Sequence, residues 1–198
     1  MTLSTTIKKC CCLLAPLTLI LLLQGCIFAA GAAAGAAGVA VVYDHRKIEG
    51  ILQDQKISQK IIDQMADIPD LQTKSRVDVT CFNRVVLLTG QTETSVLRQQ
   101  IEEVTRNTAG VSKVYDQVTV GPVISTVAHA NDLWITAKIK TEMLATKNLQ
   151  SGTMKVVTED GSVYLMGVVS KEQADMAVDI ARRVSGVVRV VKIFQYTD

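Results

Sequence analysis

The sequence predicts an α+β protein in which two tandem αββαβ units follow an N-terminal leader. An internal repeat is the first observation behind this prediction. The stretch VDVTCFNRVVLLTG, ending at Gly90, aligns with MKVVTEDGSVYLMG, ending at Gly167, 77 positions later. The second observation is that apolar spacing changes from helical to alternating in the same order within each copy. At 198 residues, the chain is long enough for two small domains.

The first helix of each unit is predicted from apolar residues at helical spacing, over 52–67 in the first unit and 131–145 in the second. The residues expected to face the core are Ile57, Ile61, Met65 and Ala66, matched by Ile135, Ile139, Met143 and Leu144. Over these helices the offset between the copies is 78, and Asp54, Lys60 and Leu71 align with Asp132, Lys138 and Leu149 as well.

Two strands follow each first helix. Val77, Val79 and Cys81 alternate with polar residues, which predicts a half-buried strand and makes Cys81 a core thiol rather than a reactive one. A tight turn near Asn83 leads to a second strand over 85–89, and Glu159-Asp160-Gly161 marks the equivalent hairpin. Second helices are predicted over 94–108 and 171–184, and third strands over 113–120 and 187–195.

Caps are predicted at the ends of the second helices. Ser170 and Gln173 have the spacing of a capping box, and Gly110 and Gly186 stand where a left-handed C-cap residue belongs. A strand–helix–strand connection is right-handed and joins parallel strands, and the hairpin adds an antiparallel neighbour. We therefore expect each unit to form a three-stranded mixed sheet with both helices on one face.

The N-terminus has the features of a secretory signal peptide. Lys8 and Lys9 precede an apolar run over 10–23, which is shorter than the roughly 20 residues that a transmembrane helix needs. The segment Leu23-Gln24-Gly25-Cys26 resembles the bacterial lipobox. This resemblance implies cleavage after Gly25 and lipid attachment at Cys26, where two or more acyl chains give stable anchoring. The alternative is a plain transmembrane anchor with an incidental cysteine.

Two features behind Cys26 bear on location. Residue 27 is isoleucine and not aspartate, which by the usual rule for such lipoproteins implies the outer membrane. The Ala/Gly-rich stretch 29–42 is either a flexible tether or a segment lying on the membrane surface. The predicted divisions are a signal peptide (1–25), a lipidated tether (26–47), a first domain (48–120), a linker (121–130) and a second domain (131–198).

Composition argues against several classes of function. Beyond Lys8 and Lys9, 19 basic residues face 19 acidic ones, so bulk charge gives no reason to expect nucleic-acid binding. Beyond residue 26 only Cys81 remains, and His45 and His129 lack ligand spacing, so we expect no metal site and no cofactor. No catalytic motif stands out, and we do not expect an enzyme.

Trp134 is the most informative single residue. On a helical wheel of about 100° per residue, it falls roughly opposite the predicted core face, and its counterpart in the first unit is Lys56. We therefore expect the one tryptophan of the chain to be exposed, with Leu133 at its edge and Lys138 one turn on. An exposed Trp beside a Lys suits a membrane interface. The alternative is that Trp134 packs against the first domain or the linker.

The repeat resembles the BON domain, a small module of bacterial envelope proteins. The motifs that carry the resemblance are the V-x-L-x-G strand ends at 86–90 and 163–167 and the turns before Val111 and Val187. Two such units behind a lipobox resemble the dual-BON outer-membrane lipoproteins. One departure is Arg84, where the hairpin usually has glycine, so we expect a distorted first turn.

The resemblance implies a lipid-anchored protein on the periplasmic face of the outer membrane, enriched at the division site. It also implies that Trp134, Leu133 and Lys138 bind anionic phospholipids such as phosphatidylglycerol and cardiolipin, in support of outer-membrane integrity and division-site envelope remodelling. The competing interpretation is an adaptor that uses the same face to bind a septal or outer-membrane assembly protein.

Overall fold

The computed structural model describes residues 48–122 and 126–197; Cys26, the leader and the 29–42 tether lie outside these ranges. The first domain contains α3 (Ile48–Ala66), the short α4 (Leu71–Lys74), β1 (Ser75–Phe82), β2 (Val85–Thr92), α5 (Ser95–Asn107) and β3 (Lys113–Val120). The second contains α6 (Thr126–Ala145), a 3-10 turn (Ser151–Thr153), β4 (Met154–Glu159), β5 (Ser162–Val169), α7 (Lys171–Arg183) and β6 (Arg189–Tyr196).

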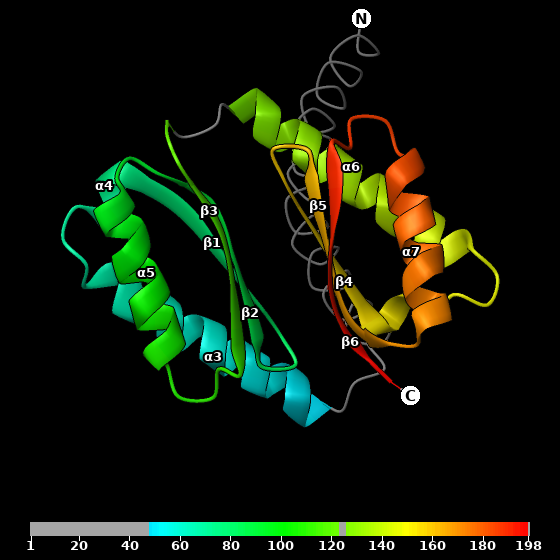
Figure 1. Ribbon diagram of the computed structural model, residues 1–198, viewed down its shortest axis with the longest axis horizontal. Coiled ribbons are helices and arrows are strands. Elements are labelled where there is room, and N and C mark those ends of the chain that lie inside the picture. The colour runs from blue at the N-terminus through cyan, green and yellow to red at the C-terminus, as the bar shows by residue number, and fades with distance from the viewer. Residues whose placement is uncertain (1–47, 123–125, 198) are drawn as a thin grey trace, which may run out of the picture. The chain divides into compact units, whose positions relative to one another are not determined.

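Both domains have the expected α+β topology. The strand orders are β1-β2-β3 and β4-β5-β6, and the central strand of each sheet pairs antiparallel with the hairpin partner and parallel with the last strand. α3 and α5 cover one face of the first sheet, and α6 and α7 cover one face of the second (Figure 1). The prediction of two mixed sheets, each with its helices on one face, is confirmed.

Each domain has an aliphatic core between its helices and its sheet. In the first domain Ile57, Ile61 and Met65 of α3 pack with β2 and α5. In the second domain the matching residues of α6 pack with β5 and α7. Cys81 is 3% exposed in the first core, and burial raises the pKa of its thiol to about 12. The thiol is therefore protonated at neutral pH, as expected of a core residue.

A third apolar cluster joins the sheet faces that carry no helices. Phe82, Val85 and Leu87 of the first domain pack with Tyr164, Met166 and Ile193 of the second. Two side-chain hydrogen bonds cross the same boundary, from Gln91 Nε2 to Glu159 Oε1 at 2.6 Å and from Asn83 Nδ2 to Gln195 Oε1 at 2.6 Å. The two BON-like units therefore bury apolar surface against each other.

Several local predictions need correction. The helix α6 begins at Thr126, so residues 126–130 are helical and not linker; the alanines at 128 and 130 favour helix, and no Gly or Pro intervenes after Pro122. The helix α3 begins at Ile48, earlier than predicted, despite Gly50. Leu144 and Ala66 do not face the core, because both are exposed at the helix ends.

The cap predictions are only partly right. Ser170 Oγ accepts a hydrogen bond from Gln173 N at 3.3 Å, but the Gln173 side chain bonds to the backbone at Asn148 and Gln150 instead of closing a capping box. Gly110 and Gly186 have positive φ, yet the C-cap residues lie two positions earlier. A Cβ on either glycine would lie 3.0–3.1 Å from the Cδ1 atom of Ile57 or Ile135, so both glycines also allow close packing against a first helix.

Arg84 does not distort the first hairpin. Both turns contain two residues with positive φ, Asn83 and Arg84 in one (49° and 65°) and Asp160 and Gly161 in the other (46° and 68°). The strand pairs on either side are equivalent, Phe82 with Val85 and Glu159 with Ser162. Arg84 thus adopts a conformation that costs an ordinary residue about 1 kcal/mol or more.

Candidate functional site

A buried carboxylate fixes each first helix to its hairpin. In the second domain Asp132 of α6 is 3% exposed, and its two carboxylate oxygens accept hydrogen bonds from Asp160 N at 2.7 Å and Gly161 N at 2.9 Å. Asp54 of α3 accepts equivalent bonds from Asn83 N at 2.7 Å and Arg84 N at 2.9 Å. These bonds explain why Asp54 and Asp132 align in the repeat.

Further contacts set the rotation of α6 about its axis. Ile135 and Ile139 are 0% exposed and Met143 is 2% exposed, all on the side that faces the sheet. The Thr136 hydroxyl donates a hydrogen bond of 2.7 Å to the Thr158 hydroxyl of β4. With this side held against the second domain, the opposite side of the helix points outward.

The outward side of α6 is mostly apolar. Trp134 is 51% exposed, Leu133 59% and Leu144 58%. We define the outer face of α6 by these exposed residues: Ala130, Leu133, Trp134, Ala137, Lys140, Thr141 and Leu144. The helix is thus apolar on both sides, one side packing in the core and the other remaining uncovered by the described residues.

Charge lies at the borders of this face. Lys138 is exposed and forms an ion pair of 3.3 Å with Glu142 one turn along. Because exposed pairs of this kind contribute little stability, an anionic group could compete for Lys138. Lys140 lies on the other border and makes no ion pair within the described residues.

Sequence reasoning missed Lys140 and Leu144. On the helical wheel both fall within about 20° of Leu133, so the same construction that located Trp134 could have found them. The prediction that Leu144 faces the core assumes that apolar residues at helical spacing share one face. That assumption fails for a helix with two apolar sides.

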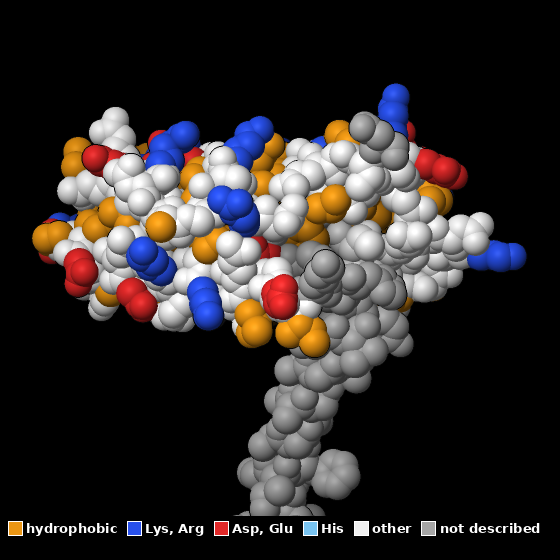
Figure 2. All heavy atoms as spheres, turned by 90° about the horizontal axis from the view of Figure 1, so that it is seen from below, with side chains coloured by type: hydrophobic (Ala, Val, Ile, Leu, Met, Phe, Trp, Pro, Cys, Tyr) orange, Lys and Arg blue, Asp and Glu red, His pale blue; other side chains and the backbone are white. Residues whose placement is uncertain are grey.

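The described residues offer little for other chemistry. No group of three or more His, Cys, Asp or Glu side chains within them could hold a metal ion. None of their helices is both long and apolar enough to cross a membrane. On the face shown in Figure 2, Lys and Arg side chains are interspersed with Asp and Glu, so that face presents no field of a single sign.

The comparisons with known proteins agree with the repeat. The model of the BON domain matches residues 53–122 and 131–198. Outer membrane lipoprotein DolP of Haemophilus influenzae is 33% identical, over 89% of this chain and 91% of its own length. A 21 kDa hemolysin of Actinobacillus pleuropneumoniae is 31% identical over 77% of this chain and 79% of its own. Osmotically-inducible protein Y of Escherichia coli is 30% identical over 76% of each chain.

Proposed function

Because this chain belongs to the BON family and carries two BON domains, we propose that it is an outer-membrane lipoprotein that binds anionic phospholipids through the outer face of α6. Cys26, within its lipobox-like segment, is the lipid-attachment residue of this proposal. The name of the Haemophilus influenzae relative supports the outer-membrane location. The proposed role is non-enzymatic.

The observation that carries the lipid-binding proposal is the exposure of Trp134, together with Leu133 and Leu144, on a helix whose other side is packed in the core. An indole ring is stable at the depth of the lipid headgroups, where its apolar body and its N–H group are both accommodated. Leucine side chains beside it add apolar area that leaves water on insertion. Lys138 and Lys140 lie at the borders, where ammonium groups can pair with anionic phosphates.

Anchoring and lipid recognition have separate parts in this proposal. The acyl chains on Cys26 hold the protein to a membrane, so α6 does not need to supply stable attachment. A weaker second contact on the same surface is favoured by the high effective concentration that the anchor creates. The outer face of α6 therefore selects which lipids surround the anchored protein.

Vesicle binding tests this proposal directly. The mature chain from residue 26, with Cys26→Ser to prevent lipidation, would be mixed with phosphatidylcholine vesicles with or without phosphatidylglycerol or cardiolipin. Trp134 is the only tryptophan, so its emission reports on this site alone. We expect a blue shift and co-sedimentation only with the anionic vesicles, and we expect Trp134→Glu to abolish co-sedimentation.

Gln55→Glu is the matched control, because Gln55 is the α3 counterpart of Leu133 and the change also adds one negative charge. Binding by this control should equal that of the parent chain. If the parent chain ignores anionic vesicles but captures a septal or outer-membrane assembly protein in a Trp134-dependent way, the lipid proposal is wrong and the adaptor function replaces it.

The proposal extends to outer-membrane integrity and envelope remodelling at the division site, which rests on the family resemblance. A fluorescent fusion of the lipidated chain should concentrate at the septum, and Trp134→Glu should spread it around the cell outline. Septal enrichment that survives Trp134→Glu would mean that α6 does not direct the protein there.

A further inference from the structure

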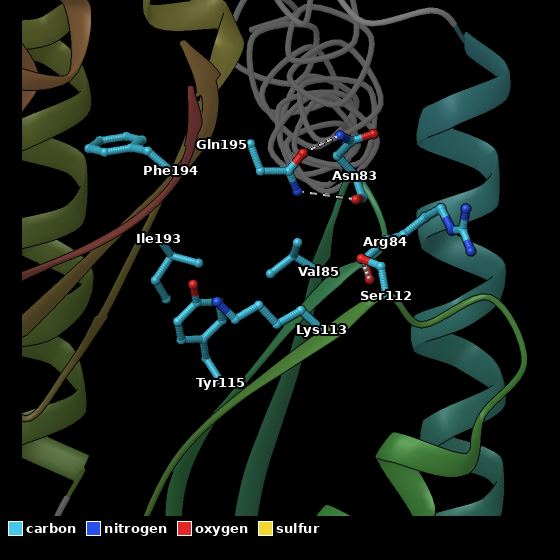
Figure 3. Close-up of a pocket in the computed structure, with 9 residues that line it drawn as sticks. All are labelled: Asn83, Arg84, Val85, Ser112, Lys113, Tyr115, Ile193, Phe194 and Gln195. Atoms are coloured by element: carbon cyan, nitrogen blue, oxygen red, sulfur yellow. Dashed lines mark hydrogen bonds between the residues drawn. The ribbon is translucent and has the colours of Figure 1, made fainter. Parts of the chain in front are cut away.

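A cavity of about 450 Å³ lies at one end of the boundary between the two domains. Its wall is built from the Asn83-Arg84 turn, the beginning of β3 and the end of β6 (Figure 3). This volume is within the range of roughly 300–1,000 Å³ typical of small-molecule sites. The cavity is distant in sequence from α6, none of whose residues lines it.

The described residues of the lining include cations and amides, and none of them is a carboxylate. Lys113 Nζ lies 4.6 Å from the centroid of the Tyr115 ring. Arg84 is occupied elsewhere, because its Nε donates to Gly110 O at 2.8 Å, and Figure 3 shows its guanidinium directed toward α3 and away from Lys113. Lys113 makes no ion pair within the described residues, so its ammonium is the charge that the cavity offers to a ligand.

Two side-chain amides and two aliphatic side chains line the cavity together with this ammonium. The Asn83 side-chain amide donates to Gln195 Oε1, and the Gln195 amide donates to the Asn83 backbone oxygen; each NH2 group keeps an N–H that can be donated to a ligand. Val85 and Ile193, which are 6% and 3% exposed, belong to the apolar cluster between the domains. The cavity thus combines a cation and neutral donors with an aliphatic and aromatic wall.

We infer that this interdomain cavity binds a small monoanionic carboxylate with an apolar body. The carboxylate would pair with Lys113 and accept from the Tyr115 hydroxyl or the amides, while the body lies against Val85 and Ile193. A single ammonium with neutral donors suits a carboxylate better than a phosphate, which proteins usually hold with several cations or a cluster of backbone N–H groups.

Two sources share this ligand chemistry: a free small carboxylate and the C-terminal carboxylate of a peptide with an apolar last residue. In both cases the ligand touches both domains, so it binds only while they are docked. By mass action, such a ligand favours the docked arrangement. The inference does not depend on the lipid-binding function of α6.

The test is a titration of the full chain, purified in a neutral detergent, with benzoate and with the peptide N-acetyl-Ala-Phe. Amide chemical shifts of Lys113, Tyr115 and Gln195 report on the cavity. We expect saturable shifts at these residues with both carboxylates, and none with benzamide or the peptide amide. A peptide that binds more tightly than benzoate points to a peptide C-terminus as the source, and the reverse order points to a free carboxylate.

Substitutions localise the effect. Lys113→Gln should weaken the carboxylate affinity by about tenfold, the loss expected for one charge-assisted hydrogen bond. Lys171→Gln removes an exposed lysine from the start of α7 and should leave the affinity unchanged. The inference is overturned if neither carboxylate shifts the cavity residues, if the neutral amides bind equally well, or if Lys113→Gln has no effect. Unchanged dispersion of the remaining amide signals shows that each variant is folded.

Discussion

The helices α3 and α6 are two copies of one element that agree on one side and differ on the other. Their inner sides have three core residues at equivalent positions. They also share a buried aspartate that accepts hydrogen bonds from the backbone of a hairpin turn. Their outer sides diverge at Gln55 and Lys56 in α3, which correspond to Leu133 and Trp134 in α6. The fold constrains only the inner side of this helix, so the outer side is free to carry a function in one copy alone.

The largest expected effect comes from giving α6 the outer residues of α3. Leu133→Gln combined with Trp134→Lys raises the net charge by one, yet it removes the apolar side chains that would enter the membrane. We expect the free energy of binding to anionic vesicles to weaken by about 3 kcal/mol, which is roughly a hundredfold loss of affinity. Co-sedimentation measures it, and retained affinity would mean that charge rather than insertion drives binding.

The reverse exchange sharpens the same comparison. Gln55→Leu with Lys56→Trp should give α3 a lipid-binding face in a chain whose α6 carries Leu133→Gln and Trp134→Lys. The indole introduced into α3 is then the only one in the chain, and its emission should shift to the blue on anionic vesicles. No shift would show that the neighbours of Trp134, such as Lys140 and Leu144, are also required.

The two buried aspartates should differ in what they contribute to stability. Asp54→Ala leaves the backbone N–H groups of Asn83 and Arg84 without their acceptor, and we expect the free energy of unfolding to fall by about 2–3 kcal/mol. Asp132→Ala should cost less, because Gly161 tolerates positive φ without support while Arg84 does not. Hydrogen exchange at residues 83–84 and 160–161 separates the domains, and an equal loss in both would contradict the assigned contribution of Arg84.

The turns themselves provide a smaller test with opposite signs. Arg84→Gly should stabilise the first domain by about 1 kcal/mol, because glycine adopts the φ of 65° without steric cost. Gly161→Ala should destabilise the second, since its φ is 68° and a Cβ there would lie 2.8 Å from Val188 Cγ2. Thermal unfolding of each variant gives the sign, and destabilisation by Arg84→Gly would show that the bond to Gly110 outweighs the backbone cost.

The smallest effect concerns the residue before each turn, Phe82 in the first domain and Glu159 in the second. Burial raises the pKa of Glu159, and the nearby Asp132 and Asp78 add to the rise, while the bond from Gln91 and the charge of Arg76 oppose it. Because the folded-state pKa is the higher one, its contribution to stability is fully present below the ordinary value of 4.5 and is lost as the pH rises through the raised pKa.

Glu159→Gln should therefore remove part of this pH dependence and leave the variant slightly more stable than the parent at pH 7. Solvent screening keeps the difference below about 1 kcal/mol. Urea unfolding at pH 4 and pH 7 measures it. A parent chain that gains stability relative to the variant on going from pH 4 to pH 7 would contradict the stated direction.

Sequence patterns correctly predicted the features that depend on the local spacing of apolar residues. Apolar periodicity located both sheets and their helices, and the helical wheel placed Trp134 outside the core. The same reasoning failed at Leu144, because spacing cannot tell a core-facing residue from one on a second apolar side. It also failed at Arg84, whose backbone conformation is supported by Asp54, a residue 30 positions away.

The cavity at Lys113 and the packing of Tyr164 against the first domain had no local signal either. Both depend on contacts between β-strands of different domains, and neither strand alone specifies its partner. Alternation predicts that a strand has an apolar face, but it does not say which surface will cover that face.

The apolar sheet faces that meet between the domains bear on why one chain carries two of them. A unit without the other would leave Val85 and Leu87, or Tyr164 and Met166, uncovered on its sheet, and exposed apolar patches of this kind promote self-association. Tandem duplication within one chain supplies the cover at a fixed ratio of one to one. Each domain thus covers the apolar sheet face through which the other would otherwise associate with further copies of the domain.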